Sequence, residues 1–288
     1  MGIYLRPDDL GEALAALARS PLTVVAGGTD FYPARVGRPL NDDVLDITAL
    51  GALRGIVEEP QRFRIGAATT WSELIAAKLP PWFDALKLAA REVGGAQIQN
   101  TGTVAGNICN ASPAADGVPA LLALDATVEL SSAAGRRVLQ LGEFILGNRR
   151  TARRPDELVT AILVPKPRHA RAYATFLKLG ARTYLVISIA MVAAVLEVAG
   201  STVAAARVAV GACSVVAQRL RRLEAELVGR PFAPGLGALV RADHLAPLSP
   251  IDDVRGTAEY RSDAAATLVA RALERLTAAS PVAVGAPR

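Results

Sequence analysis

The chain has few of the side chains that enzymes use as nucleophiles, bases or metal ligands. Among its 288 residues are only two cysteines and two histidines. Cys109 and Cys213 are too few for a disulfide framework and lack metal-ligand spacing, so we expect a reduced, cytoplasmic protein without a metal site. His169 and His244 lack any His-Glu-x-x-His context and are predicted to be surface residues. We therefore expect no catalytic side chain and infer that the chemistry belongs to a bound cofactor.

Aromatic residues make up only 5% of the chain, and the net charge of +5 is spread over separate arginine clusters. A nucleic-acid interface concentrates basic charge on one face with aromatics between, so we do not expect nucleic acid as a partner and interpret the arginine clusters, including Arg149-Arg150 and Arg153-Arg154, as a solvated or partner-facing surface. The apolar run 183–196 has 14 residues and no charged residue. A bilayer span needs about 20, so this run is predicted to be a buried core element. No secretory leader pattern opens the sequence.

The common phosphate-binding signatures are also missing. There is no G-x-x-x-x-G-K-[ST] motif, and no G-x-G-x-x-G follows a predicted strand. The chain has instead two Gly-rich segments about 75 residues apart. The first consists of Val24, Val25, Ala26, Gly27, Gly28, Thr29, Asp30 and Phe31, and the second of Gly102, Thr103, Val104, Ala105, Gly106 and Asn107.

These two segments have the chemistry of an anion site. Glycines allow positive φ and close approach of another molecule, so consecutive N–H groups can converge on a phosphate. Thr29, Thr103 and Asn107 add neutral donors, while Asp30 and Asp116 can accept hydrogen bonds from ribose or ribityl hydroxyls. Two such loops could bind the two phosphates of a dinucleotide without any Lys or Arg. Either segment alone is an ordinary turn sequence, and the pair is what favours a binding site.

Hydrophobic periodicity predicts an α+β protein with more than one domain. The segment Pro165-Lys166-Pro167 is the strongest boundary signal. Strands are expected at 22–26, 44–47, 53–57, 63–67, 127–131, 157–164, 172–178, 188–198 and 205–212. Helices are expected from Pro7 to Pro21, from a hydroxyl cap at 69–70, and at 82–93, 218–227 and 262–277, the last capped by Ser262.

At these residues the chain resembles the FAD-binding medium subunit of the molybdenum hydroxylases. That group includes carbon monoxide dehydrogenase, nicotinate and nicotine dehydrogenases, and the xanthine dehydrogenase flavin subunit. The family's A-G-G-T-D pattern is matched by residues 26–30, its T-[IVL]-G-G-N pattern by 103–107, and its A-S-P-x-x-D-x-x-P pattern by 111–119. Further similarity lies at 121–126, 176–179 with Arg182, and 249–256 with Tyr260 and Arg261.

The resemblance implies a fold and a division of the chain. It implies a two-part FAD-binding domain of the PCMH, or vanillyl-alcohol-oxidase-like, type. This would be followed by a C-terminal α+β domain with a three-stranded antiparallel sheet. The implied limits are 1–54 and 55–167 for the FAD-binding subdomains and 168–288 for the C-terminal domain, in agreement with the proline boundary.

The resemblance also implies residue roles. Residues 24–31 and 102–107 would bind the FAD pyrophosphate, Asp116 would hold a cofactor hydroxyl, and Val159 and Lys178 would lie near the flavin. Three departures from the family pattern bear on this. Ala105 replaces a glycine and requires a negative φ, Gln99 stands where an Arg is frequent, and Val186 replaces a common Asp, which suggests a drier site near the flavin.

The function implied is that of an oxidoreductase subunit. Electrons would pass from a molybdenum cofactor in a large subunit, through two two-iron two-sulfur clusters in a small one, to FAD here, and then to NAD, oxygen or a quinone. The implied assembly is a dimer of heterotrimers. Two cysteines cannot hold a four-cysteine cluster, so the clusters must lie on the partner. Two alternatives are a stand-alone flavin oxidoreductase of the same fold superfamily and an assembly protein that has lost FAD.

Overall fold

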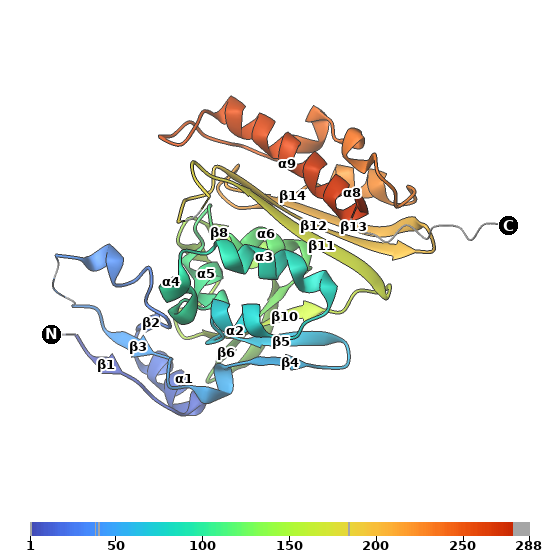
Figure 1. Ribbon diagram of the computed structural model, residues 1–288. Coiled ribbons are helices and arrows are strands. Elements are labelled where there is room, and N and C mark those ends of the chain that lie inside the picture. Colours follow the sequence, from blue (N-terminus) through green and yellow to red (C-terminus); the bar gives the residue numbers. More distant parts are fainter. Residues whose placement is uncertain (1, 38, 40, 184, 279–288) are drawn as a thin grey trace.

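The computed structural model describes residues 2–37, 39, 41–183 and 185–278, and its three main sheets follow one another along the chain (Figure 1). Residues 4–46 contribute the first sheet, 56–165 the second and 171–219 the third. The predicted mixture of helices and sheets is confirmed. The limits of the three domains stay a prediction.

The first sheet is small and parallel. Its strands lie in the order β1 (Tyr4–Leu5), β3 (Val44–Asp46) and β2 (Thr23–Val25), and helix α1 (Leu10–Arg19) connects β1 to β2. The helix predicted from Pro7 begins at Leu10, and Asp9 caps it, because Asp9 Oδ1 accepts a hydrogen bond of 3.0 Å from the Glu12 N–H. The first Gly-rich segment therefore leaves the carboxyl end of a parallel strand, β2.

The second sheet is antiparallel, in the order β4 (Ile56–Glu58), β5 (Arg62–Gly66), β10 (Leu158–Pro165), β6 (Thr127–Ser132) and β7 (Gly135–Gln140). Between β5 and β6 come α2 (Trp71–Ala76), α3 (Asp84–Glu92), α4 (Ala96–Thr101), α5 (Val104–Asn110) and α6 (Gly117–Ala123). After β7 come α7 (Leu141–Phe144) and the paired strands β8 (Ile145–Gly147) and β9 (Arg150–Thr151). The predicted hydroxyl cap of α2 is confirmed: Thr70 Oγ1 accepts from the Glu73 N–H, and Glu73 accepts from the Thr70 N–H.

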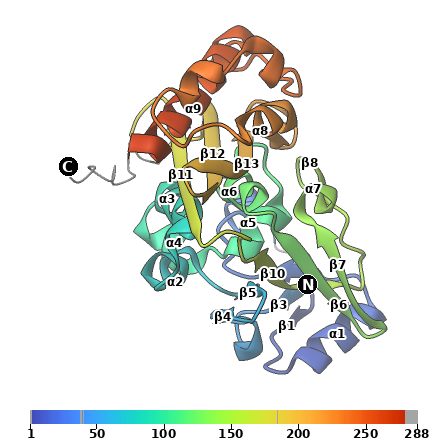
Figure 2. The same cartoon turned by 90° about the vertical axis from the view of Figure 1, so that its right-hand side faces the viewer.

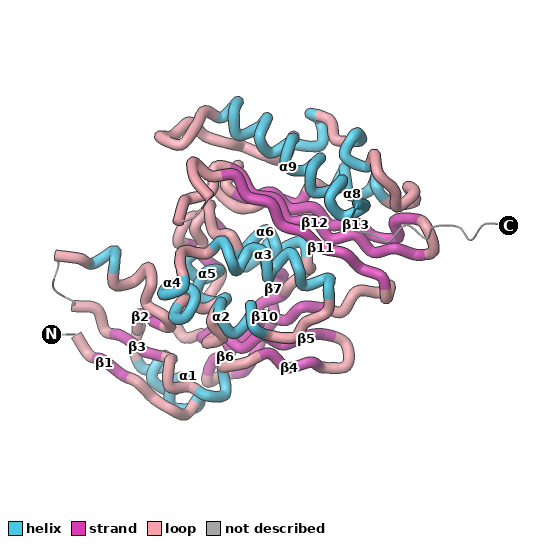
Figure 3. Tube along the Cα trace, viewed as in Figure 1, coloured by secondary structure: helices cyan, strands magenta, loops and turns pink. Residues whose placement is uncertain are grey.

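The third sheet has the order β11 (Arg171–Leu179), β12 (Ala190–Ala199), β13 (Thr202–Gly211) and β14 (Gln218–Arg219). Helices α3 and α6 cover one of its faces, and α8 (Arg221–Leu227) and α9 (Ala258–Ala278) cover the other (Figures 2 and 3). Along β12, Met191, Ala193 and Val195 face the first pair of helices, whereas Ala190, Val192, Ala194 and Leu196 face the second. Burial on both faces explains why residues 188–196 are uncharged, as predicted for a core element, whereas Thr183, Leu185 and Ile187 of the same run are exposed. None of the helices in the described ranges is long and apolar enough to cross a membrane.

Two expectations for this half of the chain are wrong. The third sheet has four strands rather than three, because Gln218–Arg219 pairs with Ala209 and Val210 before α8 begins. A strand of two residues is too short to leave a periodic signal in the sequence. His244 is fully buried rather than at the surface: its Nδ1 accepts from the Arg241 N–H at 3.1 Å, and its Nε2 lies 3.1 Å from Glu226 Oε1.

The start of α9 also differs from expectation. The helix begins at Ala258, whose N–H donates to Asp252 Oδ1 at 2.6 Å, and the Thr257 hydroxyl accepts from the Tyr260 N–H. The Ser262 hydroxyl donates to the Ala258 carbonyl within the helix and caps nothing. An aspartate six residues upstream satisfies the helix start, and such a distant cap is invisible to a local sequence pattern.

Two arginines of the third sheet bind the end of α6 and so join the two larger parts of the fold. Arg219 Nη1 donates to the Leu122 carbonyl at 2.9 Å and to Asp125 Oδ1 at 2.7 Å, while its Nη2 donates to Glu224 Oε2 at 2.9 Å. Arg207 Nε donates to the Ala123 carbonyl at 2.9 Å. Cations at a helix C-terminus satisfy its free carbonyls and complement its dipole.

The two Gly-rich segments cross in direct backbone contact. A Cβ built on Gly27 would lie 2.0 Å from the Thr101 carbonyl oxygen, and one on Gly102 would lie 3.3 Å from Thr29 Oγ1. The second segment is in turn bonded to the start of α2, because the Trp71 N–H donates to the Gly102 carbonyl at 3.1 Å. Glycine at position 27 is therefore a steric requirement.

Replacing Arg219 with Ala is expected to destabilise the fold by about 3–5 kcal/mol, because it leaves the buried Glu224 carboxylate without its main partner. Urea unfolding followed by circular dichroism measures the loss. The matched control is Arg221→Ala at the start of α8, where the arginine side chain is 71% exposed and its contact with Glu224 is worth about 0–1 kcal/mol. Equal urea midpoints for the two variants would contradict the buried bridge.

Replacing Gly27 with Ala is expected to lower the free energy of unfolding by about 1–3 kcal/mol, because the methyl group meets the Thr101 backbone, which has no side-chain freedom to give way. Gly51→Ala is the control, since a Cβ there meets nothing within 4 Å and the backbone φ is not positive. Thermal unfolding of both variants measures the difference. A Gly27→Ala protein as stable as Gly51→Ala would show that the segments do not cross as described.

Candidate functional site

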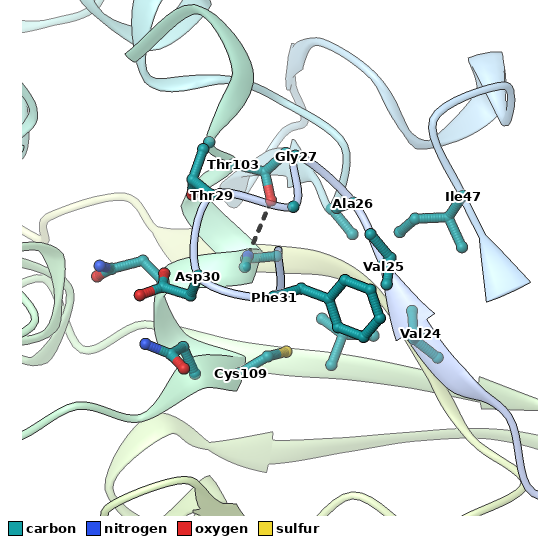
Figure 4. Close-up of a pocket in the computed structure, with 18 of the residues that line it drawn as sticks. Val24, Val25, Ala26, Gly27, Thr29, Asp30, Phe31, Ile47, Thr103 and Cys109 are labelled. Carbon is teal, nitrogen blue, oxygen red and sulfur yellow. Dashed lines mark hydrogen bonds between the residues drawn. The ribbon is translucent and has the colours of Figure 1, made fainter. Parts of the chain in front are cut away.

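A cavity of about 610 Å³ lies where the two segments cross (Figure 4). Its walls come from the end of β2, the segment that follows it, the first turns of α5, the β8–β9 hairpin and the start of β10. The residues predicted as ligand-binding that line it are Val24, Val25, Ala26, Gly27, Gly28, Thr29, Asp30, Phe31, Gly102, Thr103, Ala105, Gly106, Asn107 and Val159. The structure thus brings most of the predicted site residues to one place.

The first segment forms a compact turn around the cavity. Gly28 has a φ of 67°, and its carbonyl accepts the Tyr32 N–H at 3.1 Å. In Figure 4, Val24, Val25 and Phe31 lie on one side, with Ile47 from the neighbouring strand end, and Thr29 and Asp30 lie on the other. The cavity therefore has an apolar side and a polar side.

The second segment is a helix start rather than the predicted loop. Thr103 precedes α5, and its Oγ1 accepts the Gly106 N–H at 2.9 Å, so this amide is already bonded within the protein (Figure 4). Ala105 has a helical backbone and is 3% exposed, so its methyl group fits without strain. Val104 is fully buried and does not line the cavity. The sequence missed this helix because Thr-Val-Ala-Gly-Asn is also a turn pattern.

Asn107 carries a buried atom that needs a partner. Its Oδ1 is shielded from solvent and accepts no hydrogen bond from any described residue, although the residue lines the cavity. An unsatisfied buried acceptor costs about 1–3 kcal/mol, so a donor from a bound molecule would stabilise this site. The lining residues thus fit a polar ligand at this point.

Asp116 and Lys178 do not line the cavity but bind each other. Lys178 Nζ lies 2.9 Å from Asp116 Oδ2, and the Ser188 hydroxyl donates to Asp116 Oδ1 at 2.7 Å. Burial raises the pKa of Asp116, against the lowering effect of Lys178. Lys178 also donates to the Glu92 carbonyl at 3.3 Å, next to Val93 of the cavity wall, so the ion pair lies behind this wall.

The cavity is also lined by residues outside the predicted binding segments. Arg149 and Arg153 line it, although arginine pairs in this region were interpreted as surface charge. Cys109 also lies in the cavity wall. Burial raises the pKa of its thiol to about 11, so the thiol stays protonated at neutral pH. Gln99 lies elsewhere and donates to the Arg91 and Val93 carbonyls at the end of α3.

No cluster of three or more His, Cys, Asp or Glu side chains within the described ranges could hold a metal ion. The cavity has one apolar side, one polar side, backbone in close approach and no acid–base pair among its lining residues. Such a site is suited to binding and orienting a cofactor that carries its own reactivity.

Comparisons with known proteins agree with this geometry. A family model described as the FAD binding domain in molybdopterin dehydrogenase matches residues 1–167, and one described as the CO dehydrogenase flavoprotein C-terminal domain matches residues 175–276. The chain is 33% identical over 289 residues to the carbon monoxide dehydrogenase medium chain of Afipia carboxidovorans, covering 96% of each chain. It is 30% identical over 280 residues to the glyceraldehyde dehydrogenase medium chain of Sulfolobus acidocaldarius, covering 95% of this chain and 97% of that one.

A solved structure also matches, that of carbon monoxide dehydrogenase from Hydrogenophaga pseudoflava lacking the Mo-pyranopterin moiety of its molybdenum cofactor. The TM-score is 0.86 and the identity 31%, over 96% of this chain and 97% of that chain. The chain therefore belongs to the family of FAD-binding flavoprotein subunits of the molybdopterin dehydrogenases.

Proposed function

We propose that this cavity binds FAD noncovalently and that the chain is the flavin-carrying, electron-transferring subunit of a molybdenum-containing hydroxylase or dehydrogenase. The observation that carries the proposal is the convergence of both Gly-rich segments on one cavity inside the region matched by the FAD-binding model. A volume of about 610 Å³ lies within the usual range of small-molecule sites, about 300–1,000 Å³. Asn107 also lines the cavity, and its side-chain Oδ1 is buried without a partner among the described residues.

We assign the parts of the cavity by their chemistry. Gly27 and Gly28 let the segment 26–30 turn tightly at the cavity, because a Cβ on Gly27 would meet the Thr101 backbone and one on Gly28 would meet the Tyr32 ring. The apolar side, including Val24, Phe31 and Val159, excludes water from an aromatic ligand. FAD, when bound, supplies the redox chemistry, and the chain binds and orients it.

Asp116 and Lys178 have a different place in this proposal. The roles that the resemblance implies for them, a cofactor hydroxyl and the flavin surroundings, require the cofactor to reach beyond the residues that line the cavity, because neither side chain lines it. Bound to each other, they support the wall that contains Val93 and Asn107. Ser188 from the third sheet joins the pair, so this support reaches across the boundary at 165–167.

The route of the electrons follows from what the chain lacks. Cys109 and Cys213 cannot bind an iron–sulfur cluster that needs four thiolates, so the clusters belong to a small partner and the molybdenum cofactor to a large one. We place the chain in a cytoplasmic dimer of heterotrimers in which electrons leave FAD for NAD, oxygen or a quinone. The structure gives the lost-FAD alternative no support, because Ala105 fits its helix and Gln99 lies outside the cavity.

The full chain, purified under native conditions, is expected to contain one FAD per chain, or to bind one when FAD is added, because the cavity is preformed. Acid precipitation should release the flavin into the supernatant, and phosphodiesterase treatment should convert it to FMN, as measured by fluorescence. A colourless protein that does not change the fluorescence of added FAD would contradict the proposal.

Affinity purification of the chain from its native host is expected to bring down two further polypeptides with iron and molybdenum, because the electron donors lie on partner subunits. Metal analysis and intact-mass spectrometry of the complex check this. A lone chain that oxidises a small organic substrate would instead support the stand-alone oxidoreductase.

A further inference from the structure

The β8–β9 hairpin brings two arginines, Arg149 and Arg153, to the cavity. They come from a part of the chain more than 40 residues beyond the second Gly-rich segment. The sequence-based interpretation had the phosphates of a dinucleotide bound by backbone amides without any Lys or Arg. The hairpin contradicts this interpretation, because its two cationic side chains line the cavity.

Arg149 has a backbone conformation that its side chain does not favour. Its φ is 55°, in the left-handed region, which is typical of Gly or Asn in a tight hairpin. Gly147 in the same turn has a φ of 156°, so the chain uses glycine for one of the two positive-φ positions and arginine for the other. A bulky residue in such a position points to a function that the side chain performs.

The charges around the cavity are unbalanced. Arg35 is neutralised by Asp42, at 2.8 Å, and stacks on the Phe31 ring. For Arg149 and Arg153, no carboxylate of the described residues lies within 4.0 Å, and Asp30 is the one carboxylate among the lining residues. Two unpaired cations against one exposed carboxylate make the site attractive to an anion.

Arg149 is held in place by its backbone and Arg153 by its side chain. The Arg149 N–H donates to the carbonyl of Ala111 at the end of α5, at 3.4 Å, which fastens the hairpin to the helix that forms the opposite wall. Arg153 Nη1 donates to the Glu157 carbonyl at 2.6 Å, just before Leu158 and Val159 of the cavity wall. The Arg149 guanidinium makes no hydrogen bond with a described residue and is available for a ligand.

Resting on the proposed function, we propose that Arg149, assisted by Arg153, binds the pyrophosphate of FAD and lets the site prefer the dinucleotide over riboflavin. An arginine fork can bind phosphate oxygens with two charge-assisted hydrogen bonds, which backbone amides alone do not match. The hairpin therefore contributes the charge, and the Gly-rich segments contribute the close approach.

The test uses Arg149→Gly in the full chain, with Arg150→Gln as the matched control, because Arg150 is exposed and does not line the cavity. Glycine suits a φ of 55°, so Arg149→Gly should unfold at the same temperature as the wild type or higher. Its Kd for FAD, from fluorescence titration of the flavin-free chain, should rise about ten- to hundredfold. Its Kd for riboflavin should stay unchanged.

The salt dependence of FAD binding is a second test of the same contact. Between about 0.05 and 0.5 M NaCl, FAD binding should weaken less in Arg149→Gly than in the wild type or Arg150→Gln, because one exposed charge pair has been removed. A well-folded Arg149→Gly that binds FAD with wild-type Kd and salt dependence would overturn the inference while leaving the proposed function standing. Loss of FAD binding in the wild type itself would count against the proposed function instead.

Discussion

The contact between Gly27 and the Thr101 carbonyl is the constraint on which the rest of the N-terminal half depends. No Cβ fits between these two backbones, so the segment after β2 and the segment before α5 are held at a fixed separation. The shape of the cavity where the two segments meet depends on this crossing. The turn around Gly28, the start of α5 and the bond from Trp71 to Gly102 all take their positions from it.

A second set of contacts fixes the cavity against the rest of the molecule. Helices α3 and α6 lie between the second and third sheets, and Arg207 and Arg219 bind the carbonyls at the end of α6. The buried pair of Asp116 and Lys178 adds a further link near the cavity wall. A cofactor held in this cavity therefore rests on elements that both larger parts of the chain help to position, which favours a preorganised site.

The sequence predicted the elements that carry a strong periodic or steric signal and missed those that depend on distant partners. The strand before the first Gly-rich segment was predicted, because a short apolar run that ends in adjacent glycines is a clear signal for a strand followed by a turn. The start of α5 at Thr103 was taken for a loop, since a seven-residue helix leaves little periodicity. Arg149 was expected at the surface, because no local sequence pattern shows that its hairpin contacts the end of α5. His244 looked exposed for the same reason: its partner Glu226 lies 18 residues away.

The two-sided burial of β12 has a consequence for strand register. Both faces of this strand are apolar, so a shift by one residue would exchange them at little hydrophobic cost, and burial alone cannot align the strand. Glu197 distinguishes between the two alignments of β12. It is 2% exposed, its carboxylate lies 2.6 Å from Arg207 on β13, and it also accepts the His169 N–H. A shift by one residue would turn this charge toward the leucines of α8 and α9, so a single buried ion pair selects one alignment of the sheet.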